Sequence, residues 1–429
     1  MESEVVVLIS GQGTNLEYLM MKKINIVQVI SNKKGVRGLE IAGDLGIVVE
    51  SSGKSREEFE LQLLKIIKPC KLVILAGFMR ILTKTFIDGV GVPIINLHPS
   101  IPNGIRGNNA IRNTWDQKLT GGAMAHLVDY GVDTGQIICY KEVAWINDYL
   151  EFEKEVKRIE KNVLYDGIMA VLNMYKGKVR DCYPLGDKML VVHSDRLSAF
   201  DRYICDINGK GELLCAISAW WFCRTRHIIR NHYISHQGRN MTVWKCEAIP
   251  IEVVVRGYLA GNTKTSIWMK YCQGQRRFGN TLLKDNMKKK DELEIPIITP
   301  TTKGITDEEI SGEEIIEKGI CTKDEWNIIC DTAIRLYEFG RNLASMRGII
   351  LADTKYEFGR FIDGKLMLID ELHTPDSSRY WKAGCSLDKD FVRDYIRSKC
   401  DPYSGGELPE IDCESVRNIY SKITELICL

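Results

Sequence analysis

Strand-like and helix-like patterns alternate through the first 173 residues of the chain. The strand-like runs, which are apolar and rich in β-branched residues, are 5–10, 24–31, 71–77, 92–97, 123–131 and 136–145. Apolar residues recur at helical spacing in 57–68 and again at 149–173. Alternation of this kind is typical of βαβ units, so it predicts a Rossmann-like α/β fold with a mostly parallel sheet.

The pattern changes near residue 175. Over 175–201, short alternating segments and turns replace the βαβ rhythm, and runs such as 248–261 alternate like antiparallel strands. A long helical pattern follows at 324–348. A chain of 429 residues is also too long for one ordinary hydrophobic core. The sequence therefore predicts two domains, an α/β domain over 1–173 and an α+β domain over 174–429.

The composition narrows the classes of function. Hydrophobic residues make up 45% and charged residues 27%, and the net charge is +1, so there is no global electrostatic case for a nucleic-acid or membrane partner. No run approaches ~18 uninterrupted apolar residues, and the start MESEVVVLIS does not have the form of a signal peptide. The 14 cysteines form no CxxC pair. We therefore expect a cytoplasmic protein with reduced thiols that acts on small molecules.

IINLHPSI places an amide and an imidazole two residues apart at the end of a predicted strand. Pro99 cannot extend a central ladder, so the strand should end near His98. Residues i and i+2 of a strand point to the same side, so Asn96 and His98 would project together from its carboxyl end, where open α/β sheets bind ligands. The alternative is a strand end whose polar groups are simply hydrogen-bonded.

Two turns add candidate ligands to this edge of the sheet. SGQGTNL follows the first strand and opens a helix, so Gly13, Thr14 and Asn15 would offer donors to an anion such as phosphate. The spacing is neither the dinucleotide fingerprint nor a Walker motif, and a plain strand–turn–helix corner explains it equally well. In DYGVDTGQII, Asp133 lies in a glycine-bracketed turn, where an aspartate commonly serves the turn alone.

Together these pieces resemble the glycinamide ribonucleotide formyltransferase family. The matching stretches, which run through most of residues 1–173, are VVVLISGQGTNL, VILAGFMRIL, INLHPSIP and MAHLVDYGVDTGQII. The substrate-binding residues that the resemblance implies are Gly13, Thr14 and Asn15 for a phosphate, and Met79, Arg80, Ile81 and Leu82, with the loop around Asp133, for the folate. The catalytic residues that it implies are Asn96, His98 and Asp133.

The implied reaction moves a formyl group from 10-formyltetrahydrofolate to the amine of glycinamide ribonucleotide. As the amine attacks the formyl carbon, an oxyanion develops. Asn96 and a protonated His98 can each donate a hydrogen bond to it, and such donors typically contribute about 3 kcal/mol. Asp133 would favour the imidazolium and help to relay the proton.

Two departures from the family pattern leave rival interpretations open. The stretch 102–117 diverges where the family binds substrate, and Lys161, beside Glu160, stands where the family often carries a ribose-binding glutamate. One rival is a formyltetrahydrofolate hydrolase, because the same catalytic trio occurs there with water as the acceptor. The other is a degenerate folate- or nucleotide-binding domain attached to a working second domain.

The second domain carries basic groups beside a glycine. GKVRDCY presents Gly177, Lys178 and Arg180 on a strand or turn, which suits a polyphosphate. A solvated basic strand is the plain alternative.

Clustered carboxylates follow in DTKYE and LIDELHTPDSSR. The strand period puts Asp353, Lys355 and Glu357 on one face, and Asp370 ends another strand. If Glu357 and Asp370 meet across a strand pair, they can hold Mg²⁺, which is usually bound by one or two carboxylates together with phosphate oxygens. A surface charge ladder is the alternative.

These residues resemble phosphoribosylaminoimidazole-succinocarboxamide (SAICAR) synthetase. The match covers almost all of residues 175–429, through GKVRDCY, SDRLSAFD, IPIEVVVRGYLAGN, TPTTKG, ILADTKYEFG, IDELHTPDSSRYW and CDPYSGGELPE. In the implied reaction ATP phosphorylates the carboxylate of carboxyaminoimidazole ribonucleotide, and the amine of aspartate then displaces phosphate. Magnesium can neutralise charge on the transferring phosphoryl group and on the acceptor carboxylate.

The resemblance also implies roles for individual residues. The ATP site would be Gly177, Lys178, Arg180 and Lys355. The Mg²⁺ ligands would be Glu357 and Asp370 for the ATP-linked ion, and Glu252 and Asp307 for a second ion at the substrate carboxylate. The substrate-binding residues would be Ser198, Asp201, Arg256, Asn262 and Arg379, with Arg256 and Arg379 on the ribonucleotide phosphate. Asn262 stands where the family usually has a serine, and Thr306 where it usually has a histidine.

The two resemblances predict a bifunctional enzyme of de novo purine synthesis. The two steps are not consecutive, so they do not imply direct transfer of a product between sites. The expected partners are the small molecules glycinamide ribonucleotide, carboxyaminoimidazole ribonucleotide and aspartate. A homo-oligomer is compatible with the sequence.

Overall fold

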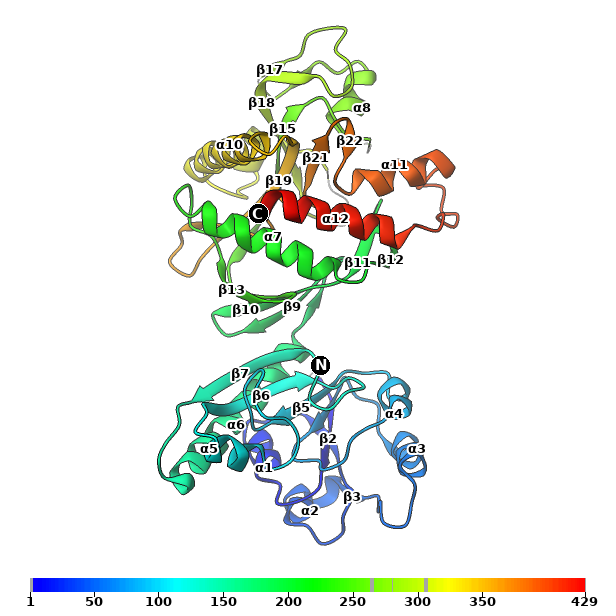
Figure 1. The fold of residues 1–429 in the computed structure, drawn as a ribbon, viewed down its shortest axis with the longest axis vertical. Helices are drawn as coiled ribbons and strands as arrows, with labels where there is room; N and C mark the ends of the chain where they lie inside the picture. The colour runs from blue at the N-terminus through cyan, green and yellow to red at the C-terminus, as the bar shows by residue number, and fades with distance from the viewer. Residues whose placement is uncertain (1–2, 263–265, 280, 305–307, 429) are drawn as a thin grey trace. The chain divides into compact units, whose positions relative to one another are not determined.

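The structure is a computed structural model that describes residues 3–262, 266–279, 281–304 and 308–428. It divides into two compact units, one of Met1–Met174 with Tyr183–Leu185 and one of Tyr175–Cys182 with Gly186–Leu429. Figure 1 colours the chain from blue at its N-terminus to red at its C-terminus. Within the described residues, no helix is both long and apolar enough to cross a membrane.

The first unit is built on one seven-stranded sheet with the order β3-β2-β1-β4-β5-β6-β7. Its strands are β1 (Val5–Ile9), β2 (Ile26–Ser31), β3 (Gly46–Val48), β4 (Leu72–Leu75), β5 (Ile94–His98), β6 (Gly121–Leu127) and β7 (Ile137–Val143). The neighbours among β1 to β5 run parallel, whereas β6 and β7 are antiparallel additions. The predicted α/β fold with a mostly parallel sheet is therefore confirmed.

Helices cover both faces of this sheet, which explains why its central strands are apolar on both sides. The helices are α1 (Thr14–Met21), α2 (Arg37–Ala42), the 3₁₀ turn η1 (Gly43–Leu45), α3 (Arg56–Ile66), α4 (Lys84–Gly89), α5 (Ala110–Asp116) and α6 (Tyr149–Leu172). Phe59 of α3 and Phe86 of α4 share a buried cluster with Leu8 of β1. On the other face, Gly167 of α6 approaches Ile95 so closely that a β-carbon would lie 3.0 Å from that side chain.

Two of these helices begin at caps that the sequence supplies. The Ser55 hydroxyl accepts from the Glu58 N–H, and the Glu58 carboxylate accepts from the Ser55 N–H, which forms a capping box for α3. The Asp148 carboxylate accepts from the Glu151 N–H at the start of α6. At these caps the two helices begin within one residue of the predicted helical patterns.

The second unit has an α+β architecture with two larger sheets. One has the order β13-β14-β10-β9-β8, and the other has the order β18-β15-β19-β21-β22 with β20 also paired to β19. The strands are β8 (Tyr175–Lys176), β9 (Arg180–Leu185), β10 (Lys188–His193), β11 (Arg196–Ala199), β12 (Arg202–Asp206), β13 (Tyr233–Gln237), β14 (Asn240–Trp244), β15 (Glu247–Tyr258), β16 (Arg277–Phe278), β17 (Thr281–Leu282), β18 (Glu292–Thr302), β19 (Ile350–Arg360), β20 (Leu366–Ile369), β21 (Ser378–Lys382) and β22 (Cys385–Ser386). The long strands β15, β18 and β19 are antiparallel neighbours, as their alternating sequence predicts.

The helices of this unit pack around those sheets. They are α7 (Lys210–Arg224), α8 (Ile267–Cys272), α9 (Gly312–Glu317), α10 (Lys323–Ser345), α11 (Asp390–Lys399) and α12 (Cys413–Cys428). Figure 1 shows α7 and α12 side by side, although the two are far apart in the sequence. The core contains the fully buried side chains Trp221, Tyr337, Tyr356 and Phe358. It leaves the opposite face of β19 available for the site described below.

Candidate functional site

A cleft of about 570 Å³ lies at the carboxyl edge of the parallel strands in the first unit. Its lining includes seven residues that the sequence singled out: Met79, Arg80, Ile81, Leu82, Asn96, His98 and Asp133. Met79 is 70% exposed and Leu82 is 6% exposed, so this segment runs from the rim of the cleft into the core. The cleft therefore has an apolar wall opposite a polar group of side chains.

Asp133 lies at the centre of that polar group and faces a donor from each of four positions. Its Oδ1 lies 3.3 Å from Asn96 Nδ2 and 3.4 Å from His126 Nε2. Its Oδ2 lies 3.4 Å from His98 Nδ1 and 3.2 Å from the Gly107 N–H. Hydrogen bonding to His126, together with the charge of the nearby His98 ring, lowers the pKa of Asp133 although burial opposes the shift. Asp133 is therefore held as a carboxylate.

The backbone conformation of Asp133 is strained. Its φ of 51° is in the left-handed region, which non-glycine residues rarely adopt and which is often retained at functional sites. The turn thus does more than reverse the chain, because it directs the carboxylate toward Asn96 and His98.

His98 is buried and has an acceptor at each ring nitrogen. Its Nδ1 faces Asp133, and its Nε2 lies 2.9 Å from the Ile105 carbonyl oxygen. A ring with an acceptor at both nitrogens is well placed to carry both protons. To donate to a substrate oxygen, His98 Nε2 must exchange the Ile105 carbonyl for that oxygen.

The predicted phosphate loop is at the same edge of the sheet but outside the cleft lining. Gly13 caps α1 with a φ of 72°, and a β-carbon on it would lie 2.6 Å from the Gly38 Cα, so this position requires glycine. Among the described residues that line the cleft, Gly13, Thr14 and Asn15 are not found. Ser10 links the loop to the cleft, because its Oγ donates to Asn32 and accepts from the Met79 N–H.

Of the two departures from the family pattern, Gly107, Asn108 and Asn109 of the stretch 102–117 line the cleft, whereas Glu160 and Lys161 on α6 do not. Burial raises the pKa of Glu160 to about 7. Its neighbour Lys161 is on the same helix, close to Asn162, which accepts a 2.5 Å hydrogen bond from Tyr18.

A second cleft, of about 630 Å³, lies in the second unit. The residues predicted from the sequence that line it are Gly177, Lys178, Arg180, Ser198, Asp201, Glu252, Arg256, Lys355, Glu357, Asp370 and Arg379. Asn262 does not line it, because its side chain donates to Asp394 and accepts from Lys289. Asp307 lies outside the described residues.

Strand register brings the charged groups of this cleft together. Glu252 of β15 pairs with Glu357 of β19, and Arg256 pairs with Asp353. Asp353 in turn pairs with Arg379 of β21. The predicted face of Asp353, Lys355 and Glu357 is therefore one wall of the cleft, flanked by a strand on each side.

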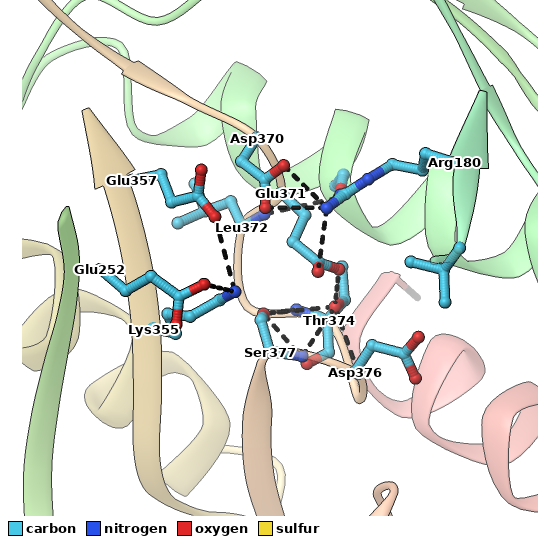
Figure 2. A network of polar contacts seen from close by, with 12 residues as sticks. Arg180, Glu252, Lys355, Glu357, Asp370, Glu371, Leu372, Thr374, Asp376 and Ser377 are labelled. Carbon is cyan, nitrogen blue, oxygen red and sulfur yellow. Dashed lines mark hydrogen bonds and ion pairs between the residues drawn. The ribbon is translucent and has the colours of Figure 1, made fainter. Parts of the chain in front are cut away.

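Each carboxylate in the middle of this cleft is held by a cation. Arg180 lies 2.7 Å from Asp370, and Lys355 lies 2.6 Å from Glu252 and 3.5 Å from Glu357. Figure 2 shows Arg180 reaching Asp370 and Glu371 from one side while Lys355 joins Glu252 and Glu357 on the other. Burial, followed by the charge of Asp370, raises the pKa of Glu357. Burial opposes ionisation of Asp370 as well, but Arg180 and the two nearby lysines lower its pKa.

Two largely buried arginines also line the cleft. Arg379 Nε lies 2.5 Å from Asp390 and its Nη1 lies 2.6 Å from Asp353. Arg256 donates to Thr299 Oγ1 at 2.8 Å, and burial lowers the pKa of Arg256 to about 10. Lys178, which is exposed, lies 2.5 Å from Asp201. The cleft therefore offers both buried and exposed cations to anionic groups.

The donor set fits a hard cation such as Mg²⁺. Glu357, Asp370 and Glu252 supply only oxygen atoms, which Mg²⁺ prefers, and all three face the same cleft. Asp370 has a φ of 72°, so the backbone is strained where it presents this carboxylate. Within the described residues, no group of three or more His, Cys, Asp or Glu side chains is arranged to hold a metal ion by itself.

The family relationship follows from a match that spans more than half of the chain. Residues 173–408 match the family model described as SAICAR synthetase. The chain belongs to the SAICAR synthetase family. Residues 3–168 match the model described as Formyl transferase, so this SAICAR synthetase is fused to a formyltransferase domain. Both predicted resemblances are confirmed at the level of the family, because the chain joins a formyltransferase domain to a SAICAR synthetase domain.

Three proteins to which the chain is similar show how far each match extends. The phosphoribosylaminoimidazole-succinocarboxamide synthase of Legionella pneumophila (strain Lens) is 42% identical over 266 residues, which are 59% of this chain and 85% of that protein. The SAICAR-synthase from Saccharomyces cerevisiae complexed with SAICAR is 30% identical, with a TM-score of 0.52 over 59% of this chain and 93% of that chain. The phosphoribosylglycinamide formyltransferase from Campylobacter jejuni subsp. jejuni NCTC 11168 is 30% identical over 40% of this chain and 99% of that chain, with a TM-score of 0.39.

The structure brings two further residues into the candidate sites. The sequence pattern assigned no role to either of them. Lys303 forms an ion pair with Glu357 in the second cleft, and its signal was the TPTTKG motif. His126 joins Asp133 in the first cleft, and its signal was the pairing of β6 with β5, which places it opposite Asn96.

Proposed function

We propose that the first unit transfers the formyl group of 10-formyltetrahydrofolate to glycinamide ribonucleotide, and that the second unit ligates aspartate to carboxyaminoimidazole ribonucleotide with ATP. The proposed domains are 1–173 and 174–429. The observation that carries the proposal is that the residues matched to each family gather in a cleft of their own unit. Asn96, His98 and Asp133 meet in one, and Lys355, Glu357 and Asp370 meet with their partners in the other.

In the first cleft, the proposed chemistry is an attack of the substrate amine on the formyl carbon. A carbon–nitrogen bond forms to the amine, and the bond to the folate N10 breaks after a tetrahedral oxyanion has developed. Asn96 Nδ2 and His98 donate to that oxyanion, and each such donor is worth about 3 kcal/mol. The proton that leaves the amine passes through the Asp133–His98 pair, and the departing N10 gains a proton.

We propose separate binding sites for the folate and for the acceptor ribonucleotide. Met79, Arg80, Ile81 and Leu82 form the wall against which the folate packs. The phosphate of the ribonucleotide binds Gly13, Thr14 and Asn15 at the start of α1, where backbone N–H groups and the helix dipole favour an anion. This phosphate site lies outside the cleft lining, so the acceptor ribonucleotide would extend along the sheet edge from its phosphate to Asn96.

In the second cleft, the substrate carboxylate attacks the γ-phosphorus of ATP and becomes an acyl phosphate. The amine of aspartate then attacks the activated carbon, and inorganic phosphate leaves. The proposed partners of the ATP phosphates are Gly177, Lys178, Arg180 and Lys355. The proposed partners of the ribonucleotide phosphate are Arg256, Arg379 and Asn262, and the proposed substrate-end residues are Ser198 and Asp201. These cations now neutralise carboxylates, so ligand binding exchanges internal ion pairs for pairs with phosphate.

Magnesium is proposed at the carboxylates of this cleft. Glu357 and Asp370 would hold the ion linked to ATP, and Glu252 with Asp307 would hold a second. When bound, the ion supplies neutralisation of charge on the phosphoryl group and the acceptor carboxylate.

A hydrolase is the second candidate for the first unit, because Gly13, Thr14 and Asn15 lie outside the cleft lining. The test follows consumption of 10-formyltetrahydrofolate by the purified full-length chain with and without glycinamide ribonucleotide. Consumption that requires the ribonucleotide supports the transferase. Equal consumption without it would establish the hydrolase, and no consumption in either case would mean that the first unit only binds.

The second activity is tested in the same preparation. Formation of SAICAR should require ATP, aspartate and carboxyaminoimidazole ribonucleotide together, and a chelator should stop it until Mg²⁺ is restored. SAICAR formation that persists without divalent cations would overturn the proposed role of the carboxylates.

A further inference from the structure

His126 and His98 face the same carboxylate from opposite sides. His98 Nδ1 lies 3.4 Å from Asp133 Oδ2, and His126 Nε2 lies 3.4 Å from Asp133 Oδ1. Both imidazoles are nearly closed off from solvent, with side-chain exposures of 6% and 3%. Asp133 is thus placed between two buried rings, one on each carboxylate oxygen.

The second nitrogen of His126 determines where its protons are. His126 Nδ1 lies 2.9 Å from the Leu127 carbonyl oxygen, which can only accept, so Nδ1 carries a hydrogen. His126 Nε2 then meets Asp133 Oδ1, and Asn96 Nδ2 donates to the same oxygen at 3.3 Å. With Nδ1 donating to Leu127, Nε2 can donate to Asp133 only when the ring carries a hydrogen on both nitrogens, whereas a neutral ring would accept at Nε2 from Asn96 Nδ2, which lies 3.1 Å away. In the doubly protonated form, His126 and Asn96 are two donors on Asp133 Oδ1. This leaves Asp133 Oδ2 to His98 and the Gly107 N–H.

We propose that His126 is a positioning residue for formyl transfer: it anchors Oδ1 of Asp133 so that Oδ2 stays on His98 and Asn96 keeps one N–H for the reacting oxygen. The proposal rests on the proposed formyltransferase function. Its physical basis is that Asp133 comes from a turn with a strained φ, so the carboxylate depends on its partners for its orientation. A β-strand supplies His126, and strands fix a side chain more firmly than loops do.

The anchor has an electrostatic consequence as well as a geometric one. A donor on Oδ1 favours the ionised form of Asp133, so its removal should make the carboxylate easier to protonate. The other charged or titratable side chains that line the cleft are Arg56, Arg80, His98 and Asp129. None of them changes in a His126 variant, so a moved acid limb of kcat/KM would report on Asp133.

The first experiment compares His126→Leu with His126→Gln in the full-length chain. Leucine removes the donor, whereas the glutamine amide can still donate to Asp133. We expect kcat for formyl transfer to fall about 30-fold in His126→Leu, the loss of one hydrogen bond to a charged group, with KM for the ribonucleotide changed less than about threefold. His126→Gln should recover most of kcat, and the acid limb should move to higher pH only in His126→Leu.

The matched control is Cys139→Ala. Cys139 pairs with Ala125 on the neighbouring strand, and its thiol donates toward α6 at the Val163 carbonyl, on the other face of the sheet. This change should lower the stability of the first unit without moving the acid limb. A His126→Leu enzyme with wild-type kcat, or one that loses activity without any rescue by glutamine, would overturn the proposal.

A double-mutant cycle locates the action of His126. If His126 acts through Asp133, then His126→Leu should cost little when added to Asp133→Asn, because the two residues act as a unit. Losses that multiply would overturn the proposal, since they would mean that His126 acts independently of Asp133.

Nitrogen-15 spectra of histidine-labelled protein test the contact without turnover. Asp133→Asn should shift the ring signals of both His98 and His126, while the distant His227 should not change. This result stands even if the wild-type chain transfers no formyl group, so failure of the proposed function is distinguishable. Spectra in which Asp133→Asn moves only His98 would contradict the shared carboxylate.

Discussion

The carboxylates of the two candidate sites are held by different kinds of neighbours. In the formyltransferase unit one carboxylate, Asp133, is surrounded by neutral or imidazole donors from β5, β6 and a loop backbone. In the synthetase unit three carboxylates, Glu252, Glu357 and Asp370, are each paired with a lysine or arginine. The turn that carries Asp133 organises the first site, whereas a network of ion pairs along β19 organises the second.

The difference predicts different sensitivities. A site built on one carboxylate should lose its activity when the imidazole that shares it is removed, with little effect on the fold. A site built on buried pairs should lose activity and stability together, because removing one partner leaves the other charge buried and uncompensated. The variants below test that contrast, starting with the largest expected effect.

His98→Ala should produce the largest change. It removes the only ring that contacts both Asp133 and the Ile105 carbonyl in the described cleft, and general acid–base groups of this kind contribute about 10²- to 10⁴-fold. We expect formyl transfer to fall by about 10³-fold, measured as ribonucleotide-dependent folate consumption. SAICAR formation by the same preparation is the internal control, and a comparable loss there would contradict independent sites.

Glu357→Gln should lower the synthetase activity by about 100-fold and also destabilise the second unit. The amide keeps the shape of the carboxylate but removes its charge. Lys303 then loses its ion-pair partner, whereas Lys355 still pairs with Glu252. Glu338→Gln, an exposed change on α10, is the matched control and should alter neither property. Normal SAICAR formation by Glu357→Gln would remove Glu357 from the proposed metal site.

His193→Phe should change how the stability of the second unit depends on pH. His193 is buried, neither ring nitrogen has a hydrogen-bond partner among the described residues, and burial lowers its pKa to about 3. In the unfolded chain a histidine titrates near 6.5, so below that pH the unfolded state binds an extra proton and the free energy of unfolding falls. The loss between about pH 7.5 and about pH 5 is about 2 kcal/mol for this residue.

The phenylalanine variant cannot bind that proton, so its free energy of unfolding should fall by about 2 kcal/mol less over the same pH interval. Hydrogen exchange followed by mass spectrometry would measure this for the second unit. His227→Gln, on an exposed histidine, should leave the pH dependence within about 0.5 kcal/mol of the wild type. An unchanged pH dependence in His193→Phe would mean that His193 is not kept neutral by burial.

Asn262→Ala should have the smallest effect. Its side chain is outside the lining of the second cleft and is engaged by Asp394 and Lys289. We expect KM for carboxyaminoimidazole ribonucleotide to rise less than about threefold, in the range of an exposed polar contact. A rise of tenfold or more would place Asn262 on the substrate phosphate after all.

Local pattern predicted most of the fold because the deciding signals were short-range. The run VVVLI became a fully buried strand, and the helical spacing of 149–173 became α6 with the cap that Asp148 supplies. The i, i+2 rule also placed Asn96 beside His98, and Lys355 beside Glu357, on the correct faces.

What the sequence did not predict depends on contacts between distant segments. His126 gained its place only when β6 paired with β5, and Arg180 reached Asp370 across 190 residues of chain. The sequence likewise did not predict which cation pairs with each carboxylate, because a strand pattern indicates only the face on which a charged side chain lies. The requirement for glycine at position 13 is a further consequence of tertiary packing, because Gly38 approaches it from α2.

The most direct test of two independent enzymes on one chain measures both reactions in the same preparations of wild type, His98→Ala and Glu357→Gln. We expect the wild type to perform both, His98→Ala to keep SAICAR formation but lose formyl transfer, and Glu357→Gln to do the reverse. A wild-type chain without ribonucleotide-dependent formyl transfer, or a variant that loses both activities while each unit remains folded, would contradict it.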